Sequence, residues 1–149
     1  MVITFGPEGV TAHPDHVAVG VAATAAFHAV RDPGIDGLAR LLHIAIPQSS
    51  LDRFNELLRR RGMQPIDPMQ DFQPRGVADA SIGALVDCSA VYERKVEALR
   101  AHRTQAELQD VPFELWREML AQEAFVVAFP DRGGDEPLLR DVFETLHRP

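Results

Sequence analysis

The hydrophobic positions along the chain follow two spacings. Short runs of aliphatic and β-branched residues predict four strands, at residues 2–5, 41–46, 82–87 and 124–129. Apolar residues that recur every three or four positions predict five helices, at residues 15–30, 51–61, about 90–105, 113–120 and 137–147. Because strands and helices alternate, the pattern predicts an α/β fold with a mainly parallel sheet.

Two of these elements have a composition that indicates burial. Residues 15–30 are rich in Ala and Val, which predicts a largely buried helix, and the Asp-Pro-Gly sequence at 32–34 ends it. Residues 41–46 are apolar without interruption and are followed by proline. A run of this kind is typical of a central strand that is buried on both faces.

Polar residues indicate where the later helices begin. Ser49 or Ser50 is placed to cap the second helix, and Asp87 or Ser89 to cap the third. Between them, residues 63–80 contain three prolines and few periodic apolar positions, which predicts a long loop. Long loops in compact domains are usually functional or mobile.

Composition narrows the class of protein. The chain has 149 residues, of which 46% are hydrophobic and 25% charged, and no repeat or boundary divides it, so we expect a single domain over residues 1–149. A net charge of −7 gives no electrostatic reason to bind nucleic acid or an anionic membrane. Cys88 is the only cysteine, so no intrachain disulfide forms. The N-terminus has no leader pattern and no apolar run is long enough to span a bilayer, so we expect a cytoplasmic protein.

The candidate chemistry lies in the loop between the first strand and the first helix. In α/β sheets, ligands bind at the carboxyl ends of strands, where this loop is expected. Pro14 suits the first helical position, so His13 is expected just outside the helix, with Asp15 and His16 in its first turn. The positive end of the helix dipole favours anionic Asp15 and neutral His16, the form that binds a metal. Spacing alone leaves an alternative open, in which these are ordinary polar residues of a loop and a helix start.

A family resemblance bears on this choice. Residues 4–16 (Thr-Phe-Gly-Pro-Glu-Gly-Val-Thr-Ala-His-Pro-Asp-His) resemble the second signature of the PIG-L (LmbE-like) de-N-acetylases, zinc enzymes that remove acetyl groups from N-acetylglucosamine-type conjugates and related amides. The resemblance covers roughly residues 2–129. It continues in a strand that ends in proline, a Val-Asp-Cys-Ser segment, an Arg-Lys pair, an Ala-Leu-Arg-Ala-His-Arg-Thr-Gln segment and a Glu-Ala-Phe strand, at residues 41–47, 86–89, 94–95, 98–105 and 123–125.

The resemblance implies roles for individual residues. It implies that His16 is a Zn²⁺ ligand, that His13 polarises the amide carbonyl, and that Asp15 orients its histidine neighbours. It also implies that Thr11 and His102 contact the substrate, a small N-acetylated molecule. For His102, capping of a helix end is an equal alternative. The implied fold is a Rossmann-like three-layer structure that corresponds to the C-terminal part of the family.

The chain also departs from the family pattern. The first signature, Ala-His-Pro-Asp-Asp-Glu, supplies two zinc ligands and the catalytic base in the family and is not found here. A catalytic zinc site usually has three protein ligands, so we expect an incomplete site and a sheet without its N-terminal βα units. A homodimer or an N-terminal segment would complete the sheet. Ala12 replaces the usual Gly, and Thr11 stands where the family can have Tyr. The alternative function is a non-catalytic binding module that reuses the half-fold.

Other residues with reactive side chains have simpler interpretations. We expect His28 to be a packed or surface residue, His43 a hydrogen-bonded core residue and His147 part of the tail. Cys88 is expected to be a small buried hydrophobe.

Three further residues have side chains that suit the rim of a site. Trp116 is expected to pack in the core or at a rim rather than to serve as a sugar platform. Glu8 and Asp79 are candidates to line the mouth of the site.

Overall fold

Four strands form one mixed sheet in the computed structural model, which describes residues 1–31, 38–104, 113–133, 135–144 and 146. The strands are β1 (Val2–Phe5), β2 (Leu41–Ala45), β3 (Ala84–Asp87) and β4 (Gln122–Phe129), in the spatial order β1-β2-β4-β3. All four lie close to their predicted positions. The α/β class is confirmed, but the prediction of a mainly parallel sheet is wrong, because only β1 and β2 run parallel and β4 is antiparallel to both of its neighbours.

The number of helices between β3 and β4 explains the antiparallel pairs. A single crossover helix returns the chain to the starting end of a strand and produces a parallel neighbour. Here two helices, α3 (Tyr92–Ala101) and α4 (Phe113–Leu120), separate β3 from β4, so β4 begins at the edge where β3 ends. The register places the last residue of β3, Asp87, opposite the first residue of β4, Gln122.

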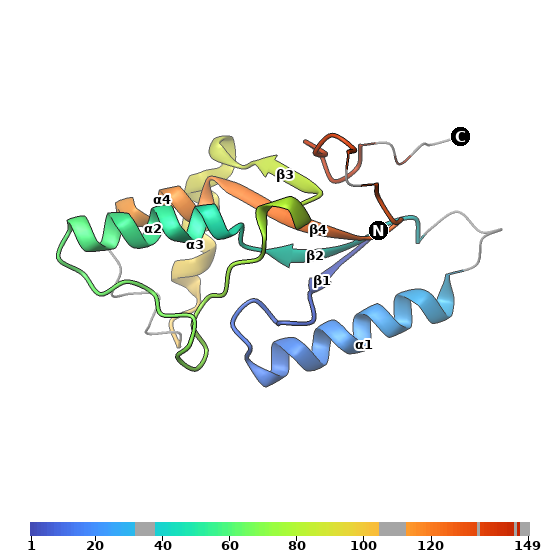
Figure 1. Ribbon diagram of the computed structural model, residues 1–149, viewed down its shortest axis with the longest axis horizontal. Helices are drawn as coiled ribbons and strands as arrows, with labels where there is room; N and C mark the ends of the chain where they lie inside the picture. The colour runs from blue at the N-terminus through green and yellow to red at the C-terminus, as the bar shows by residue number, and fades with distance from the viewer. Residues whose placement is uncertain (32–37, 105–112, 134, 145, 147–149) are drawn as a thin grey trace.

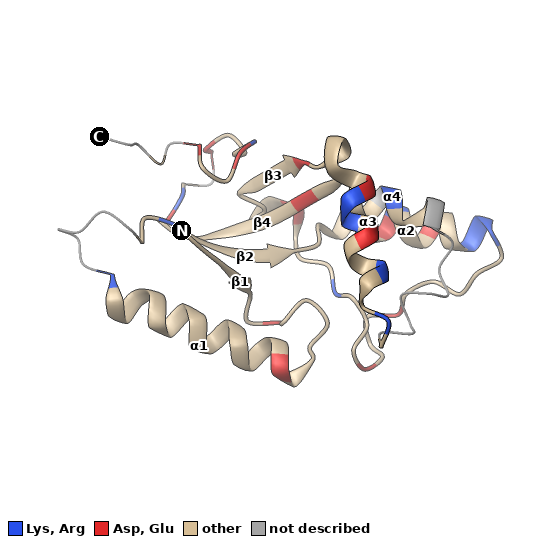
Figure 2. Ribbon diagram, turned by 180° about the vertical axis from the view of Figure 1, so that it is seen from behind, with Lys and Arg blue, Asp and Glu red and all other residues tan. Residues whose placement is uncertain are grey.

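Helix α1 (Pro14–Val30) lies along one face of the sheet beside β1 (Figure 1). Close contact is possible because Gly20 has no side chain: a Cβ there would lie 2.6 Å from the carbonyl oxygen of Phe5. The prediction that this helix is largely buried is wrong. Only Gly20 and Phe27 are buried, whereas Val21 and Val30 are at least 60% exposed. The helix is apolar on all sides but packs on one, and Figure 2 shows that charged residues are confined to its ends.

The remaining helices gather beyond one end of the sheet (Figure 1). Helix α2 (Gln48–Arg60) packs against α4, and α3 also contacts α4. Phe54 and Leu58 of α2 and Leu115 of α4 form the buried centre of this group. Leu51 of α2 is also buried and Leu57 is half-buried, so the apolar positions of this helix lie on its inner face. A Rossmann-like three-layer arrangement stays a prediction.

The start of α2 differs from expectation. Neither Ser49 nor Ser50 caps the helix, which begins at Gln48 after Pro47. The carboxylate of Asp79, thirty residues later, accepts a hydrogen bond from the Ser49 amide at 3.1 Å. This backbone hydrogen bond is the main cause that lowers the pKa of Asp79. The loop after α2 therefore supplies the cap that the local sequence does not.

Helix α3 begins later than predicted. A 3₁₀ turn (Ser89–Val91) precedes it, and the Asp87 carboxylate accepts from the Ser89 amide at 2.8 Å, so Asp87 orders the turn before the helix. The helix ends at Ala101, so the predicted extension toward residue 105 is wrong as far as His102 to Thr104, and residue 105 lies outside the described residues.

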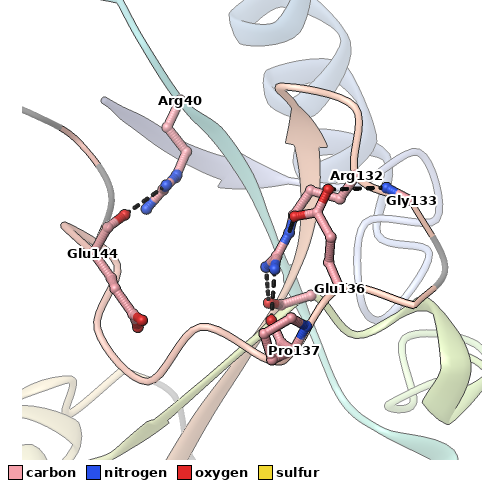
Figure 3. Close-up of polar contacts among 7 residues, drawn as sticks. Arg40, Arg132, Gly133, Glu136, Pro137 and Glu144 are labelled. Carbon is pink, nitrogen blue, oxygen red and sulfur yellow. Dashed lines mark hydrogen bonds and ion pairs between the residues drawn. The ribbon is translucent and has the colours of Figure 1, made fainter.

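The predicted C-terminal helix over residues 137–147 is wrong for the described residues, which form turns and one β-bridge. Leu139 pairs with the edge of β3, exchanging backbone hydrogen bonds with Gly83 and Leu85. Two arginines bind carbonyl groups of the same segment (Figure 3): buried Arg40 donates to Glu144, and Arg132 donates to Pro137. These contacts take up polar groups that a helix would use internally, and they cover the β3 edge.

Two of the family-like segments have a structural role. Lys95 on α3 forms an ion pair with Glu123 on β4 at 2.7 Å and donates to the carbonyl of Leu120 at 2.6 Å. The Arg-Lys and Glu-Ala-Phe segments thus hold α3 against the start of β4. Within the described residues, no helix has the length and hydropathy that a membrane span requires.

Candidate functional site

The loop between β1 and α1 has a strained backbone. Gly9, Val10 and Ala12 adopt positive φ angles of 62°, 61° and 55°. Left-handed geometry is easy for glycine but rare for a β-branched residue such as Val10. Ala12, which stands in place of the glycine of the resembled signature, therefore has a backbone geometry that favours glycine. Non-glycine residues of this kind cluster at functional sites, where the surrounding structure holds them.

His16 is held in one orientation by this loop. Its Nδ1 lies 3.1 Å from the carbonyl oxygen of Gly9 and 3.3 Å from the hydroxyl of Thr11, and its ring stacks on Phe5 at 4.1 Å. A carbonyl oxygen only accepts, so Nδ1 carries the hydrogen. The Nε2 atom of neutral His16 therefore has a free lone pair. In metal-binding histidines, the ring nitrogen that does not bind the metal usually donates to a carbonyl or carboxylate in this way.

His13 has the opposite hydrogen-bonding pattern. It is the N-cap of α1, and its Nδ1 accepts a hydrogen bond from the Asp15 amide at 3.2 Å. Neutral His13 must therefore carry its hydrogen on Nε2, which makes that atom a donor. The Asp15 carboxylate lies 3.9 Å from Nδ1 and is exposed. The predicted positions of all three residues at the start of α1 are confirmed.

The two histidines share one cleft of about 750 Å³. Their ring centroids are 5.2 Å apart, and Thr11 and Asp15 line the cleft beside them. Residues 63–74, in the loop after α2, form the opposite wall, and Phe72 of this loop packs on His13 at 4.8 Å. The volume is in the range of small-molecule sites.

The cleft wall is fixed at both ends. The buried Asn55 side chain on α2 pairs with the backbone of Ile66 through hydrogen bonds of 2.7 and 3.0 Å. At the other end, the Arg75 amide donates to the carbonyl of Val10 at 2.8 Å, which joins the wall to the histidine loop (Figure 1). The two loops therefore form one surface.

Other predicted mouth residues lie elsewhere. His102 is exposed at the C-cap of α3 and is not among the described residues that line the cleft. Glu8 forms a 3.8 Å ion pair with Arg75, and Asp79 caps α2, as described above. Trp116 of α4, expected to pack in the core or at a rim, is half-buried: it stacks on Phe54 at 6.0 Å and also lines the cleft.

His28 and His43 fit their simpler interpretations, whereas Cys88, which was expected to be buried, is half-buried. The exposed residue His28 packs edge-on against Phe27 and Phe129. His43 is hydrogen-bonded to the Thr24 hydroxyl at 3.1 Å, and burial lowers its pKa. Burial also raises the pKa of the half-buried Cys88 thiol, which makes it a poor nucleophile. His147 lies outside the described residues.

Metal-ligating groups do not form a complete cluster in the described part of the chain. No three His, Cys, Asp or Glu side chains there are arranged to hold one ion. His16 nevertheless fits one ligand position, because its side chain lines the cleft and its Nδ1 is engaged, which leaves Nε2 to bind a metal. The site can therefore provide one metal ligand and one adjacent hydrogen-bond donor.

Comparison with known proteins identifies relatives along nearly the whole chain. A protein of Saccharomonospora viridis named 1D-myo-inositol 2-acetamido-2-deoxy-alpha-D-glucopyranoside deacetylase is 35% identical over 151 residues, which cover 98% of this chain and 53% of that protein. Proteins of the same name from Thermobispora bispora and Geodermatophilus obscurus are 31% and 30% identical, over 85% and 98% of this chain. The chain spans about half the length of the curated relatives it matches. No family model matches the chain.

The fold and the histidine loop thus define an α/β protein related to sugar N-deacetylases. The chain belongs to the PIG-L (LmbE-like) deacetylase family and resembles the C-terminal portion of its members.

Proposed function

We propose that this chain carries the carbonyl-binding part of a zinc-dependent N-deacetylase site, which acts on an N-acetylglucosamine-type conjugate. The opposite hydrogen-bonding of the two histidines carries the proposal: both residues line the same cleft, and neutral His16 has a lone pair on Nε2 where neutral His13 has an N–H. The names of the relatives, which describe deacetylation of an acetamido sugar linked to inositol, support the substrate class.

Each residue has a distinct task in this proposal. His16 holds the metal through Nε2, and Thr11 and Gly9 keep its ring in place. When bound, Zn²⁺ supplies a Lewis acid and an activated water for amide hydrolysis. His13 donates from Nε2 to the acetyl carbonyl oxygen, where negative charge develops in the transition state. Asp15 keeps the ring of His13 aligned through its backbone amide, which donates to Nδ1.

The remaining ligands and the base are proposed to come from polypeptide outside these 149 residues. Two features support a junction beside β1. The strand pairs only with β2 among the described residues, so its other edge is open, and the adjacent α1 exposes Val19, Val21 and Val30. A second copy of the chain could occupy the same edge. An open strand edge next to an apolar helix face is a site for pairing with another segment.

Zinc titration of the 149-residue chain, with a chromogenic chelator as competitor, tests the ligand assignment. We expect weak binding, because one ligand is present, and a loss of roughly ten-fold or more in affinity for His16→Ala. His28→Ala is the matched control, since it removes an exposed histidine of the same helix. Equal zinc affinity in His16→Ala and wild type would refute the assignment of His16. Tight stoichiometric binding by the chain alone would refute the proposal that ligands come from elsewhere.

Amine release tests the reaction class. With an N-acetylglucosaminyl-inositol conjugate as substrate and zinc in excess, we expect the chain alone to release little or no amine. In an assembly that contains the remaining ligands, His13→Ala should lower kcat about 10²- to 10³-fold, as loss of an oxyanion donor does elsewhere. A kcat that is unchanged in His13→Ala would exclude the carbonyl-binding role.

A further inference from the structure

A second cavity adjoins the histidine loop and shares no described lining residue with the cleft. Its volume is about 430 Å³, in the range of small-molecule sites. The lining changes from the cavity to the cleft between Val10 and Thr11, and from the cleft to the cavity between Pro74 and Arg75. The hydrogen bond from the Arg75 amide to the Val10 carbonyl therefore lies at the boundary between the two spaces.

The lining of this cavity is mainly apolar. It includes aliphatic residues from the histidine loop, β2, β4 and the segment that follows the cleft wall, among them Val10, Ala45, Val77 and Val126. His43 is one of the few lining residues with a polar side chain, and burial lowers its pKa and favours the neutral ring. Arg75 is the only Lys or Arg among the described lining residues.

One edge of the Arg75 guanidinium has no partner within the described part of the chain. Its Nη1 lies 3.8 Å from the carboxylate of Glu8, and an ion pair that is this long and this exposed contributes little. The Nε atom is buried and makes no hydrogen bond, and no described residue accepts from Nη2. A buried donor without a partner costs free energy, so a ligand that accepts from Nε recovers that cost.

The apolar lining and the single guanidinium together favour one class of ligand. The Nε and Nη2 atoms of arginine form an edge that binds a carboxylate through two parallel hydrogen bonds. An aliphatic chain attached to that carboxylate would bury apolar surface against the lining. A neutral hydrocarbon would leave Nε unpaired, whereas a phosphate dianion would bring a second charge into an apolar cavity that has one cation.

We propose that this cavity is a binding site for an aliphatic monocarboxylate. The carboxylate binds the Nε–Nη2 edge of Arg75, and the chain packs against the aliphatic residues that include Val77 and Val126. The site lies outside the cleft that holds the histidines, and it does not depend on the proposed deacetylase function.

Titration of the isotope-labelled chain with octanoate, followed through its backbone amide signals by NMR, tests the site. EDTA is present so that the carboxylate cannot bind through a metal ion. We expect saturable shifts at Gly9, Gly76 and Val77, with an affinity in about the millimolar range or tighter. Along the series butyrate, hexanoate and octanoate, the affinity should rise about three- to four-fold for each added CH₂ group, because each buries more apolar surface.

Two comparisons test the role of the guanidinium. Arg75→Gln should weaken octanoate binding about ten-fold or more, because it removes a charge-assisted pair but keeps the backbone hydrogen bond to Val10. Arg61→Gln is the matched control, since it removes an exposed arginine at the end of α2 that lies outside the cavity lining. Octyltrimethylammonium has the same chain with a cationic head, and it should bind wild type at least about ten-fold more weakly than octanoate. This second comparison needs no variant, so it holds even if Arg75→Gln lowers stability.

Several results would overturn the site: no saturable shift with octanoate, equal affinity for butyrate and octanoate, or equal weakening by Arg75→Gln and Arg61→Gln. Equally strong binding of octyltrimethylammonium would overturn the anionic class of ligand. Shifts confined to Thr11 and His13 would place the ligand in the cleft and would refute the assignment to the cavity. Because the titration needs neither zinc nor turnover, its failure is distinct from failure of the His16 assignment.

Discussion

Asn55 offers a direct test of how the cleft wall is held. Its side chain is 8% exposed and projects from α2 to the backbone of Ile66, where the loop begins to form the wall. The amide nitrogen donates to the Ile66 carbonyl at 3.0 Å, and the amide oxygen accepts from the Ile66 N–H at 2.7 Å. Replacement of Asn55 by alanine removes the hydrogen-bond partners of both the N–H and the C=O of Ile66 at once.

The magnitude follows from the groups left unpaired. In Asn55→Ala, the N–H and C=O of Ile66 lose their partners in a half-buried position. A buried polar group without a partner costs about 1–3 kcal/mol, and half-burial places each group near the lower end of that range because water reaches it. We therefore expect a loss of about 2 kcal/mol in the free energy of unfolding, roughly a 30-fold change in the folding equilibrium.

Urea unfolding of the variant measures this loss. The m-value should stay unchanged, because the same core unfolds, while the midpoint falls. Glu56→Ala is the matched control: it lies next to Asn55 on α2 and removes only exposed ion pairs with Arg59 and Arg60, for which we expect less than about 0.5 kcal/mol. A loss in Asn55→Ala no larger than in Glu56→Ala would refute the anchoring role.

Three further predictions concern residues outside the cleft. Burial lowers the pKa of His43 below its ordinary value of 6.5, so the unfolded chain binds a proton more readily than the folded one. The free energy of unfolding should therefore fall as the pH drops below about 6.5. In urea titrations across pH 5 to 7, about the range in which histidine titrates, His43→Gln should flatten the dependence of this free energy on pH. An unchanged dependence would exclude His43 as its source. Burial raises the pKa of the Cys88 thiol, so its reaction with iodoacetamide should be far slower in the folded chain than in urea. The rates should be compared at pH 8, about half a unit below the pKa of a free thiol. Equal rates would contradict the burial of Cys88. Gly20→Ala should lower thermal stability by about 1–3 kcal/mol, because the new Cβ would meet the Phe5 carbonyl, whereas Gly133→Ala adds a Cβ in open space and should be nearly neutral; equal losses would show that the α1–β1 contact can relax.

Local sequence patterns were sufficient for most of the elements. The four strands and the helices through α4 lie near their predicted positions, and α4 has the predicted bounds. Periodicity and helix-stop signals are local, so they can be read from one segment at a time. The direction of β4 is not a local property. It depends on pairing with residues more than thirty positions away, which the order of the predicted elements does not specify.

The errors at element ends have the same origin. Residues 137–144 have a helical pattern of apolar positions, but Leu139 pairs with β3, and Arg40 and Arg132 bind carbonyl groups of the segment. The cap of α2 comes from Asp79 rather than from either adjacent serine. In each case a distant group offers a hydrogen bond that overrides the local preference, and nothing in the local sequence indicates which distant group it is.

One part of the candidate site could be predicted from the local sequence and the other part could not. Pro14 fixes where α1 begins, so the positions of His13, Asp15 and His16 followed from sequence. The opposite wall of the cleft could not be predicted from sequence. Its polar residues do recur at a spacing of three, at Gln64, Asp67, Gln70 and Gln73, and this spacing marks one side of the loop. This spacing becomes a signal only once Asn55 and Val10 are known to fix the ends of the loop, because only a fixed wall presents its side chains to a single ligand. The strained Val10 is part of both features: its carbonyl binds the wall, and its left-handed backbone follows the Gly9 carbonyl that orients His16. The histidine loop therefore positions the chemistry and the cleft wall together, and a change at Val10 should disturb both.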